Sequence, residues 1–291
     1  MVSAFGSSVL LERERETSLL EHVWREAAAG RGSTWLLCAE AGGGKTRLAG
    51  ELAASVGRGR TRWGAAEPVS PPDPYLAVGR ALPGFEPAPG RAGSVERALD
   101  LLRQAEEPVL LVLDDLHYAD EGTVAVLVRL AGESARRRWL ILAAFRPEEG
   151  TAALREGATE IVAQGMARRL NLPPLSRGAV ARLVTAVRRR PAERPEVDAI
   201  YTDSGGNPWF AEALARGNGA VTTARDRINL RLERFERENP GAHTVLAALA
   251  PAARPLPHDI VAALRNGDSP ALRRTLAGLR DAGLLRESDD G

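Results

Sequence analysis

Two short stretches of the chain carry the residue types that bind phosphate groups and a divalent cation. The first is AEAGGGKT at residues 39–46, which follows a short apolar run and precedes leucines at helical spacing. Glycines let backbone N–H groups turn inward around phosphate oxygens, and the N-terminus of the following helix adds a partial positive charge. Lys45 would reach the β- and γ-phosphates, and the Thr46 hydroxyl would ligate Mg²⁺. We therefore expect phosphates to lie against Ala41, Gly42, Gly43, Gly44, Lys45, Thr46 and Arg47.

The basic residues strengthen this interpretation. Lys45 is the lone lysine among 39 basic residues, and all the others are arginine. A compact ammonium suits the space between phosphates better than a planar guanidinium. The alternative is a glycine-rich turn before an ordinary amphipathic helix. Phosphate loops of this kind usually begin with glycine, whereas this chain has Ala39, whose methyl group requires a negative φ.

The second stretch is VLLVLDD at residues 109–115. Its five consecutive apolar residues predict a strand buried on both faces of a parallel sheet. The carboxyl ends of such strands lie where ligands of open α/β sheets collect. Asp114 would hold Mg²⁺, directly or through water, and Asp115 would orient the attacking water. A turn-initiating pair of aspartates is the alternative.

An arginine follows the next buried run, Trp139–Phe145. If that run is a neighbouring strand, Arg146 lies at the same edge of the sheet and faces the γ-phosphate. The alternative is a surface arginine before Pro147.

The elements that must position these groups follow an α/β pattern. Apolar runs predict parallel strands, and amphipathic segments predict helices on both faces of the sheet. A helix is expected from Arg13 to Gly30. The other expected strands lie at 35–38, 61–66 and 168–172, and the other expected helices at 45–56, 75–82, 94–105 and 124–131.

Beyond Pro173-Pro174 the pattern is helical. Ser176 is the expected N-cap of one helix, and Asn207 the N-cap of another that has Pro208 in its first position. Three later helices followed by the start of a strand have the order of a winged helix, but the sequence stops before the wing. We therefore expect an α/β domain at 1–172, a helical lid at 173–239 and a truncated winged-helix-like domain at 240–291.

Composition is that of a globular protein. The 291 residues are 44% hydrophobic and 26% charged, with a net charge of +1, so no global basic field indicates nucleic acid or membrane binding. The single cysteine, Cys38, excludes an internal disulfide bond and fits a reducing cytoplasm. No apolar run approaches the length of a membrane span.

These motifs together resemble the STAND branch of the AAA+ P-loop ATPases, particularly the ATPase module of large LuxR-type transcriptional regulators. The resemblance runs from about Leu11 to Leu285. DDLHYAD at 114–120 resembles the extended Walker B segment of that family, FRPEE at 145–149 its sensor segment, and GNP at 206–208 its lid motif. LERE at 11–14 resembles its opening motif, in which glycine usually precedes the arginine, so Glu12 is a departure.

The resemblance implies that Mg²⁺ and ATP or ADP bind between the α/β domain and the lid, with Arg13 and Pro208 against the adenine. It implies an ATP-dependent signalling switch that hydrolyses slowly and belongs to a longer protein with C-terminal sensor and DNA-binding domains. Self-association that depends on ATP is consistent with this function, whereas direct DNA binding by this fragment is not expected.

Three other functions remain open. The first is an AAA+ initiator or remodelling ATPase that acts on DNA through its winged helix. A small-molecule kinase and a nucleotide-binding module without hydrolysis are the others. His117 has no derived chemistry, and a hydrogen-bonded polar residue is favoured over a catalytic base.

Overall fold

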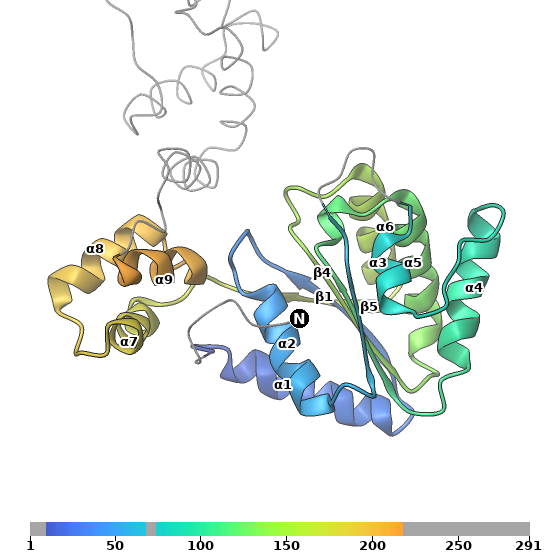
Figure 1. Cartoon of the computed structure of the whole chain (residues 1–291), viewed down its shortest axis with the longest axis horizontal. Coiled ribbons are helices and arrows are strands. Elements are labelled where there is room, and N and C mark those ends of the chain that lie inside the picture. The colour runs from blue at the N-terminus through green and yellow to red at the C-terminus, as the bar shows by residue number, and fades with distance from the viewer. Residues whose placement is uncertain (1–9, 68–73, 218–291) are drawn as a thin grey trace, which may run out of the picture.

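The computed structural model describes residues 10–67 and 74–217 (Figure 1). Five strands form one parallel sheet in the order β2-β3-β4-β1-β5, which confirms the predicted α/β fold. All five predicted strands are present. They are β1 (Ser33–Cys38), β2 (Thr61–Ala65), β3 (Val109–Asp114), β4 (Trp139–Phe145) and β5 (Ala167–Asn171).

Helices cover both faces of this sheet, because the central strands are apolar on both sides. In β3, Leu110 and Val112 pack on one face, whereas Leu111 and Leu113 pack on the other. The first face is covered by α1 (Glu14–Ala28) and α2 (Lys45–Val56) (Figure 1). The second is covered by α3 (Leu76–Ala81), α4 (Arg91–Arg103), α5 (Glu121–Ser134) and α6 (Ala152–Ala163).

Helix α6 is not among the elements predicted from the sequence. Gly157 lies in its middle, where glycine is unfavourable for an isolated helix. A Cβ at this position would lie 2.9 Å from Cγ1 of Val124 on α5. The glycine therefore permits close packing of α5 and α6, and this contact outweighs the weak local preference.

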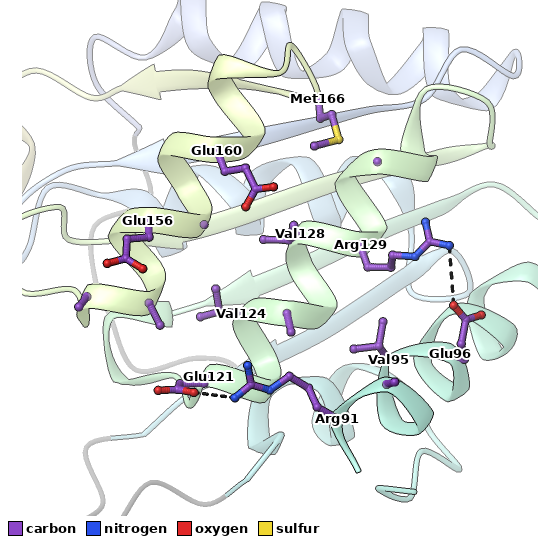
Figure 2. Close-up of a pocket in the computed structure, with 16 residues that line it drawn as sticks. Arg91, Val95, Glu96, Glu121, Val124, Val128, Arg129, Glu156, Glu160 and Met166 are labelled. Atoms are coloured by element: carbon purple, nitrogen blue, oxygen red, sulfur yellow. Dashed lines mark hydrogen bonds and ion pairs between the residues drawn. The ribbon is translucent and has the colours of Figure 1, made fainter. Parts of the chain in front are cut away.

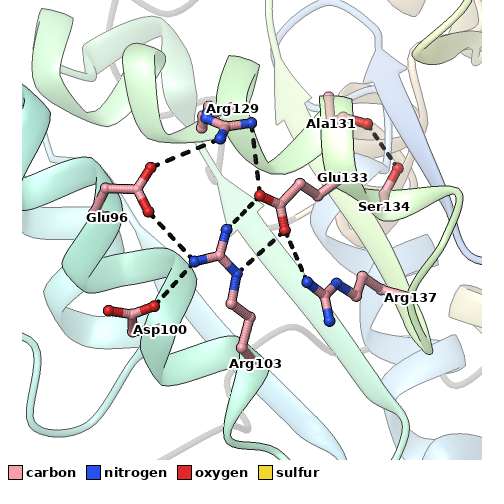
Figure 3. A network of polar contacts seen from close by, with 8 residues as sticks. All are labelled: Glu96, Asp100, Arg103, Arg129, Ala131, Glu133, Ser134 and Arg137. Atoms are coloured by element: carbon pink, nitrogen blue, oxygen red, sulfur yellow. Dashed lines mark hydrogen bonds and ion pairs between the residues drawn. The ribbon is translucent and has the colours of Figure 1, made fainter.

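An ion-pair network joins α4 to α5 (Figure 3). Glu133 on α5 accepts hydrogen bonds from Arg103 on α4 and from Arg137, and Arg129 lies 3.6 Å from it. Arg103 also contacts Asp100 and Glu96 on its own helix. These contacts, Arg103 first, hold the pKa of Glu133 below its ordinary value. The network thus fixes the packing of two helices on the same face of the sheet.

Three further helices form a hydrophobic cluster of their own after β5. They are α7 (Arg177–Arg188), α8 (Arg194–Ser204) and α9 (Pro208–Arg216) (Figure 1). Ser176 accepts a hydrogen bond from the N–H of Ala179, which confirms it as the N-cap of α7. The expected winged-helix-like segment at 240–291, and the lid beyond residue 217, lie outside the described residues. None of the helices in residues 10–67 and 74–217 is long and apolar enough to cross a membrane.

Candidate functional site

The glycine loop lies between the carboxyl end of β1 and the first turn of α2. Gly42 and Gly44 have φ angles of 72° and 94°, a region that disfavours side chains. Ala39 is not among the described non-glycine residues with positive φ, as its methyl group requires. A Cβ at Gly43 would lie 2.7 Å from the Cβ of Ala39, so the loop is compact here and needs glycine.

The loop presents backbone donors at the start of α2. Gly43 N–H donates to the carbonyl of Glu40 at 3.2 Å. Within the described residues, no backbone carbonyl accepts from the N–H of Gly44, Lys45 or Thr46. Unpaired N–H groups at the N-terminus of a helix of this length form an anion-binding site.

The ammonium of Lys45 points back into the loop. Its Nζ donates to the carbonyl of Ala39 at 2.8 Å and to that of Glu40 at 3.0 Å. Burial lowers the pKa of Lys45, and the nearby Arg146 guanidinium lowers it further, although Asp115 and Asp114 oppose both. A polyanion placed at the loop would favour the charged ammonium.

Thr46 and Asp114 meet across the gap between α2 and β3. The Thr46 hydroxyl hydrogen-bonds to the Asp114 carboxyl. Burial raises the pKa of Asp114, the bond from Thr46 lowers it, and the charge of Asp115 raises it. Asp114 is 2% exposed and also accepts from the N–H of Asp115 at 2.9 Å.

These two oxygens fit a magnesium ion. Mg²⁺ prefers oxygen ligands and is usually held by one or two protein groups, with water and phosphate oxygens in the remaining positions. No group of three His, Cys, Asp or Glu side chains within residues 10–67 and 74–217 could hold a metal ion. An ion at Thr46 and Asp114 would therefore depend on the phosphates for its other ligands.

Asp115 is held at the turn that follows β3, just before the short 3₁₀ helix Leu116–Tyr118. Its φ of 51° is in the left-handed region, which asparagine and aspartate tolerate better than most residues. The side chain is 41% exposed, so it is accessible to water. The structure thus brings Asp115 close to Lys45 and Arg146, and its negative charge acts to raise the pKa of both.

His117 is buried behind Asp115, and the expectation that its hydrogen bonds are satisfied is wrong. Among the residues that the structure describes, neither ring nitrogen has a hydrogen-bond partner, and Nδ1 lies 4.0 Å from Oδ1 of Asp115. The ring packs against Tyr118 with its centroid 4.1 Å away. Burial, followed by the charge of Arg146, lowers the pKa of His117 to about 4, so the ring is neutral at pH 7.

Arg146 lies directly after β4, beside β3, as expected from the sequence. Its guanidinium forms an ion pair with Glu149, which the sequence placed in the FRPEE segment without a role of its own. Burial acts to lower the pKa of Arg146, but the hydrogen bonds and charge of Glu149, together with the charges of Tyr118 and Asp115, outweigh it, and the pKa lies above its ordinary value. The positive charge of Arg146 also lowers the pKa of both Lys45 and His117.

The N-terminus of α9 lies against the glycine loop. Asn207, which is 1% exposed, donates to Oε1 of Glu40 and to the carbonyl of Ala41. The N–H of Trp209 lies 3.4 Å from the carbonyl of Gly42. The sequence identified Asn207 as an N-cap and as part of the GNP lid motif, but not as the hydrogen-bond partner of Glu40, more than 160 residues away.

Pro208 occupies the first turn of α9 and is half-buried, between the two residues that contact the loop. Arg13 is placed differently. Its buried guanidinium donates to the carbonyls of Glu12 and Pro173, at the connection between β5 and α7. The contacts of Arg13 therefore tie the N-terminal segment to this connection and do not include the glycine loop.

A separate groove of about 1030 Å³ lies between α4, α5 and α6 (Figure 2). Valine and alanine side chains line its floor, and ion pairs of Arg91 with Glu121 and of Arg129 with Glu96 lie at its rim. None of its lining residues belongs to the glycine loop. The groove is therefore distinct from the candidate phosphate site.

Comparison with solved structures finds the same overall fold in other proteins. No family model matches the chain, and no curated protein matches it. The chain is similar to the ORC1 protein of Aeropyrum pernix in complex with DNA, with 17% identity, 96% of this chain and 84% of that chain covered, and a TM-score of 0.53. It is also similar to the ORC2 protein of Aeropyrum pernix in ADPNP–ADP complexes, with 15% identity, coverage of 98% and 90%, and a TM-score of 0.54.

Proposed function

We propose that the chain is a Mg²⁺-dependent ATP-binding switch with slow ATPase activity. The observation that carries this proposal is the convergence at one sheet edge of a glycine loop, a lone lysine, and the Thr46–Asp114 pair. In this proposal Lys45 and the loop N–H groups bind the phosphates, and Thr46 and Asp114 hold Mg²⁺. The ORC2 structure in ADPNP–ADP complexes supports a nucleotide as the ligand of this fold.

The chemistry assigned to the remaining groups is phosphoryl transfer to water. The magnesium ion would neutralise charge on the phosphates as the reaction proceeds. Asp115, accessible to water, would orient the attacking molecule. Arg146 would leave Glu149 and stabilise charge on the γ-phosphate. The lowered pKa makes His117 a weak base near pH 7, and the proposal assigns it no proton transfer.

At the finer level we propose a STAND-type module that regulates transcription in the cytoplasm within a longer protein. Contacts of Asn207 and Trp209 with the loop support this reading, because they let one ligand affect both the sheet and α9. Adenine contacts by Arg13 and Pro208 are part of the same proposal. We also propose the domain limits 1–172 for the α/β domain, 173–239 for the lid and 240–291 for the winged-helix-like domain.

The direct test is nucleotide binding. Denaturing the purified protein and identifying the released nucleotide by chromatography should yield ADP. Calorimetric titration should then show that Lys45→Ala weakens ATP binding by about 10- to 100-fold, the value of a charge-assisted hydrogen bond. Equal binding by Lys45→Ala and parent would contradict the site.

Arg58→Ala is a matched control for the loss of one positive charge. Arg58 is exposed after the end of α2, whereas Lys45 begins this helix. Helix α2 is about 17 Å long at 1.5 Å per residue, and Arg58 lies two residues beyond its end. The control should bind ATP like the parent, so a loss in both variants would indicate a nonspecific effect of charge.

A second function is favoured by one comparison. The ORC1 structure contains DNA, and an initiator-type ATPase that acts on DNA is therefore the alternative proposal. The arginines through which it would act, Arg273, Arg274 and Arg280, lie outside the described residues. Strong DNA binding that falls steeply with salt would support it. Weak binding without this salt dependence would favour the signalling switch.

A further inference from the structure

Both ends of the Asn207 side-chain amide are in use, and they contact different elements. Its Oδ1 accepts from the N–H of Trp209 at 3.1 Å and of Phe210 at 3.4 Å, which caps α9. Its Nδ2 donates to Oε1 of Glu40 at 3.0 Å and to the carbonyl of Ala41 at 2.7 Å. A cap needs only the acceptor, so the two donor contacts require a second explanation.

The donor contacts fix the direction of loop N–H groups. Because the peptide bond is planar, holding the carbonyl of Ala41 also sets the orientation of the N–H of Gly42. The N–H of Trp209 contacts the carbonyl of Gly42 and in the same way orients the N–H of Gly43. Two consecutive peptide planes of the loop are therefore held from α9.

The fit between the loop and α9 is also close in space. A Cβ at Gly42 would lie 2.8 Å from both Oδ1 of Asn207 and the Cβ of Trp209. Gly206, just before Asn207, is pressed against the connection from β5, and its carbonyl accepts from the N–H of Leu175 at 2.7 Å. Asn207 is thus held from both sides and has little freedom to turn away.

We infer that Asn207 is a positioning residue for the phosphate loop, supplied by α9. Its amide donors hold Glu40 and Ala41 so that the loop has its phosphate-binding shape only while α9 is docked. This inference rests on the proposed function, because that function assigns the loop to nucleotide phosphates. By linkage, any event that moves α9 changes nucleotide affinity, and nucleotide binding favours the docked position of α9 to the same extent.

The test separates the role of Asn207 as the N-cap of α9 from its role as a hydrogen-bond donor to the glycine loop. Serine is a good N-cap but has no amide donor, and it adds no charge. Asn207→Ser should therefore keep α9 folded while its affinity for ADP falls about 10-fold, the size of a lost hydrogen-bond contribution. In the nucleotide-free protein, amide hydrogen exchange of peptides covering residues 40–46 should become faster, while that of α5 should not change.

A pair of substitutions at Asn207 and Glu40 gives a second, independent test of the contact between these side chains. Asn207→Asp also keeps the cap but places a carboxylate against the Glu40 carboxylate, so it should weaken ADP binding at pH 8. Adding Glu40→Gln restores a donor between the two side chains and should recover part of the affinity. A merely structural role of Asn207 predicts no such recovery. Glu40→Gln alone controls for the loss of charge near the phosphates.

The outcomes distinguish this inference from the function on which it rests. If the parent binds neither ADP nor ATP, the proposed function is wrong and the inference fails with it. If the parent binds ADP and Asn207→Ser binds equally well, with unchanged exchange at residues 40–46, only the inference is wrong. Weakened binding with faster loop exchange, together with recovery in the Asn207→Asp/Glu40→Gln double variant, supports both.

Discussion

Arg146 donates through Nη1 to both carboxylate oxygens of Glu149, at 2.9 Å to Oε1 and 2.7 Å to Oε2. The arginine proposed to face the γ-phosphate is thus already engaged by a carboxylate of its own loop. The side chain of Glu149 is 44% exposed, and exposed ion pairs contribute at most about 1 kcal/mol. A phosphate group could therefore displace Glu149 at small cost.

Glu149→Gln should increase the preference for ATP over ADP. The substitution removes the charge that competes for Arg146, and only ATP offers a γ-phosphate in its place. We expect up to about a 5-fold gain in the ratio of ATP to ADP affinity, equivalent to 1 kcal/mol. Calorimetric titration of both nucleotides measures this ratio. Glu148→Gln, an exposed neighbour, is the matched control, and an equal change in both variants would refute the specific competition.

Arg146→Ala should bind ADP like the parent and respond little to ATP. A ligand shifts a conformational equilibrium only by its difference in affinity for the two states, and this variant removes the proposed difference. Limited proteolysis near Pro173-Pro174, with each nucleotide, measures the response. Identical cleavage patterns for ADP and ATP in the parent would argue against a switch within this chain.

Asp114→Ala should remove the Mg²⁺ dependence of ATP binding. The variant loses one of the two protein oxygens proposed for the ion, while Lys45 and the loop remain. Titrations with Mg²⁺ and with a chelator should differ in the parent and agree in the variant. Persisting Mg²⁺ dependence would place the ion elsewhere.

Asp115→Asn should leave nucleotide binding intact and lower turnover. Asparagine keeps the size of the side chain and tolerates the positive φ, but it cannot attract a proton from the attacking water as a carboxylate does. Phosphate release under saturating ATP measures the effect. Unchanged hydrolysis would show that another group orients the water.

The neutral, buried ring of His117 predicts a pH dependence of stability. The unfolded chain binds a proton near pH 6.5, whereas the folded chain binds it only near pH 4, so the unfolded state gains protons first as the pH falls. Stability is therefore lost between pH 6.5 and 4. At pH 5 the loss through this group should be about 2 kcal/mol relative to pH 7.5.

Urea unfolding at pH 7.5 and pH 5 measures this loss. His117→Phe keeps an aromatic ring against Tyr118 but cannot be protonated, so its stability should fall less at pH 5 than that of the parent. His22→Gln, at an exposed position of α1, is the control and should behave like the parent. The same pH dependence in His117→Phe and the parent would mean that His117 is not the group responsible.

Glu12 predicts a difference between two substitutions. It has a φ of 52°, which explains why glycine is usual at this position of the resembled motif. Its carboxylate accepts from the N–H of Ser176 at 2.7 Å and from the Ser176 hydroxyl, which ties the N-terminal segment to α7. Glu12→Ala loses the hydrogen bonds to Ser176 and keeps the unfavourable φ. Glu12→Gly loses the same hydrogen bonds, but glycine adopts this φ without strain. The alanine variant should be the less stable by about 1 kcal/mol in urea unfolding.

The sequence alone was sufficient to predict the strands, the glycine loop between β1 and α2, and the N-caps Ser176 and Asn207. Each depends on neighbours along the chain. The apolar run 109–113 makes a doubly buried strand, the glycines of AEAGGGKT permit positive φ, and Ser176 and Asn207 cap helices within three residues. Lys45 and Asp114 were identified because loop and strand motifs of this kind have a known relation at a sheet edge.

Contacts between distant segments required the folded structure. Helix α6 forms because Gly157 fits against Val124, although its local pattern is weak. The side-chain N–H groups of Asn207 donate to Glu40 and Ala41, more than 160 residues away, and burial lowers the pKa of His117 so that the ring is neutral. No local pattern encodes these relationships, because they arise only when the close packing of the folded chain sets which polar groups meet and which are shielded from water.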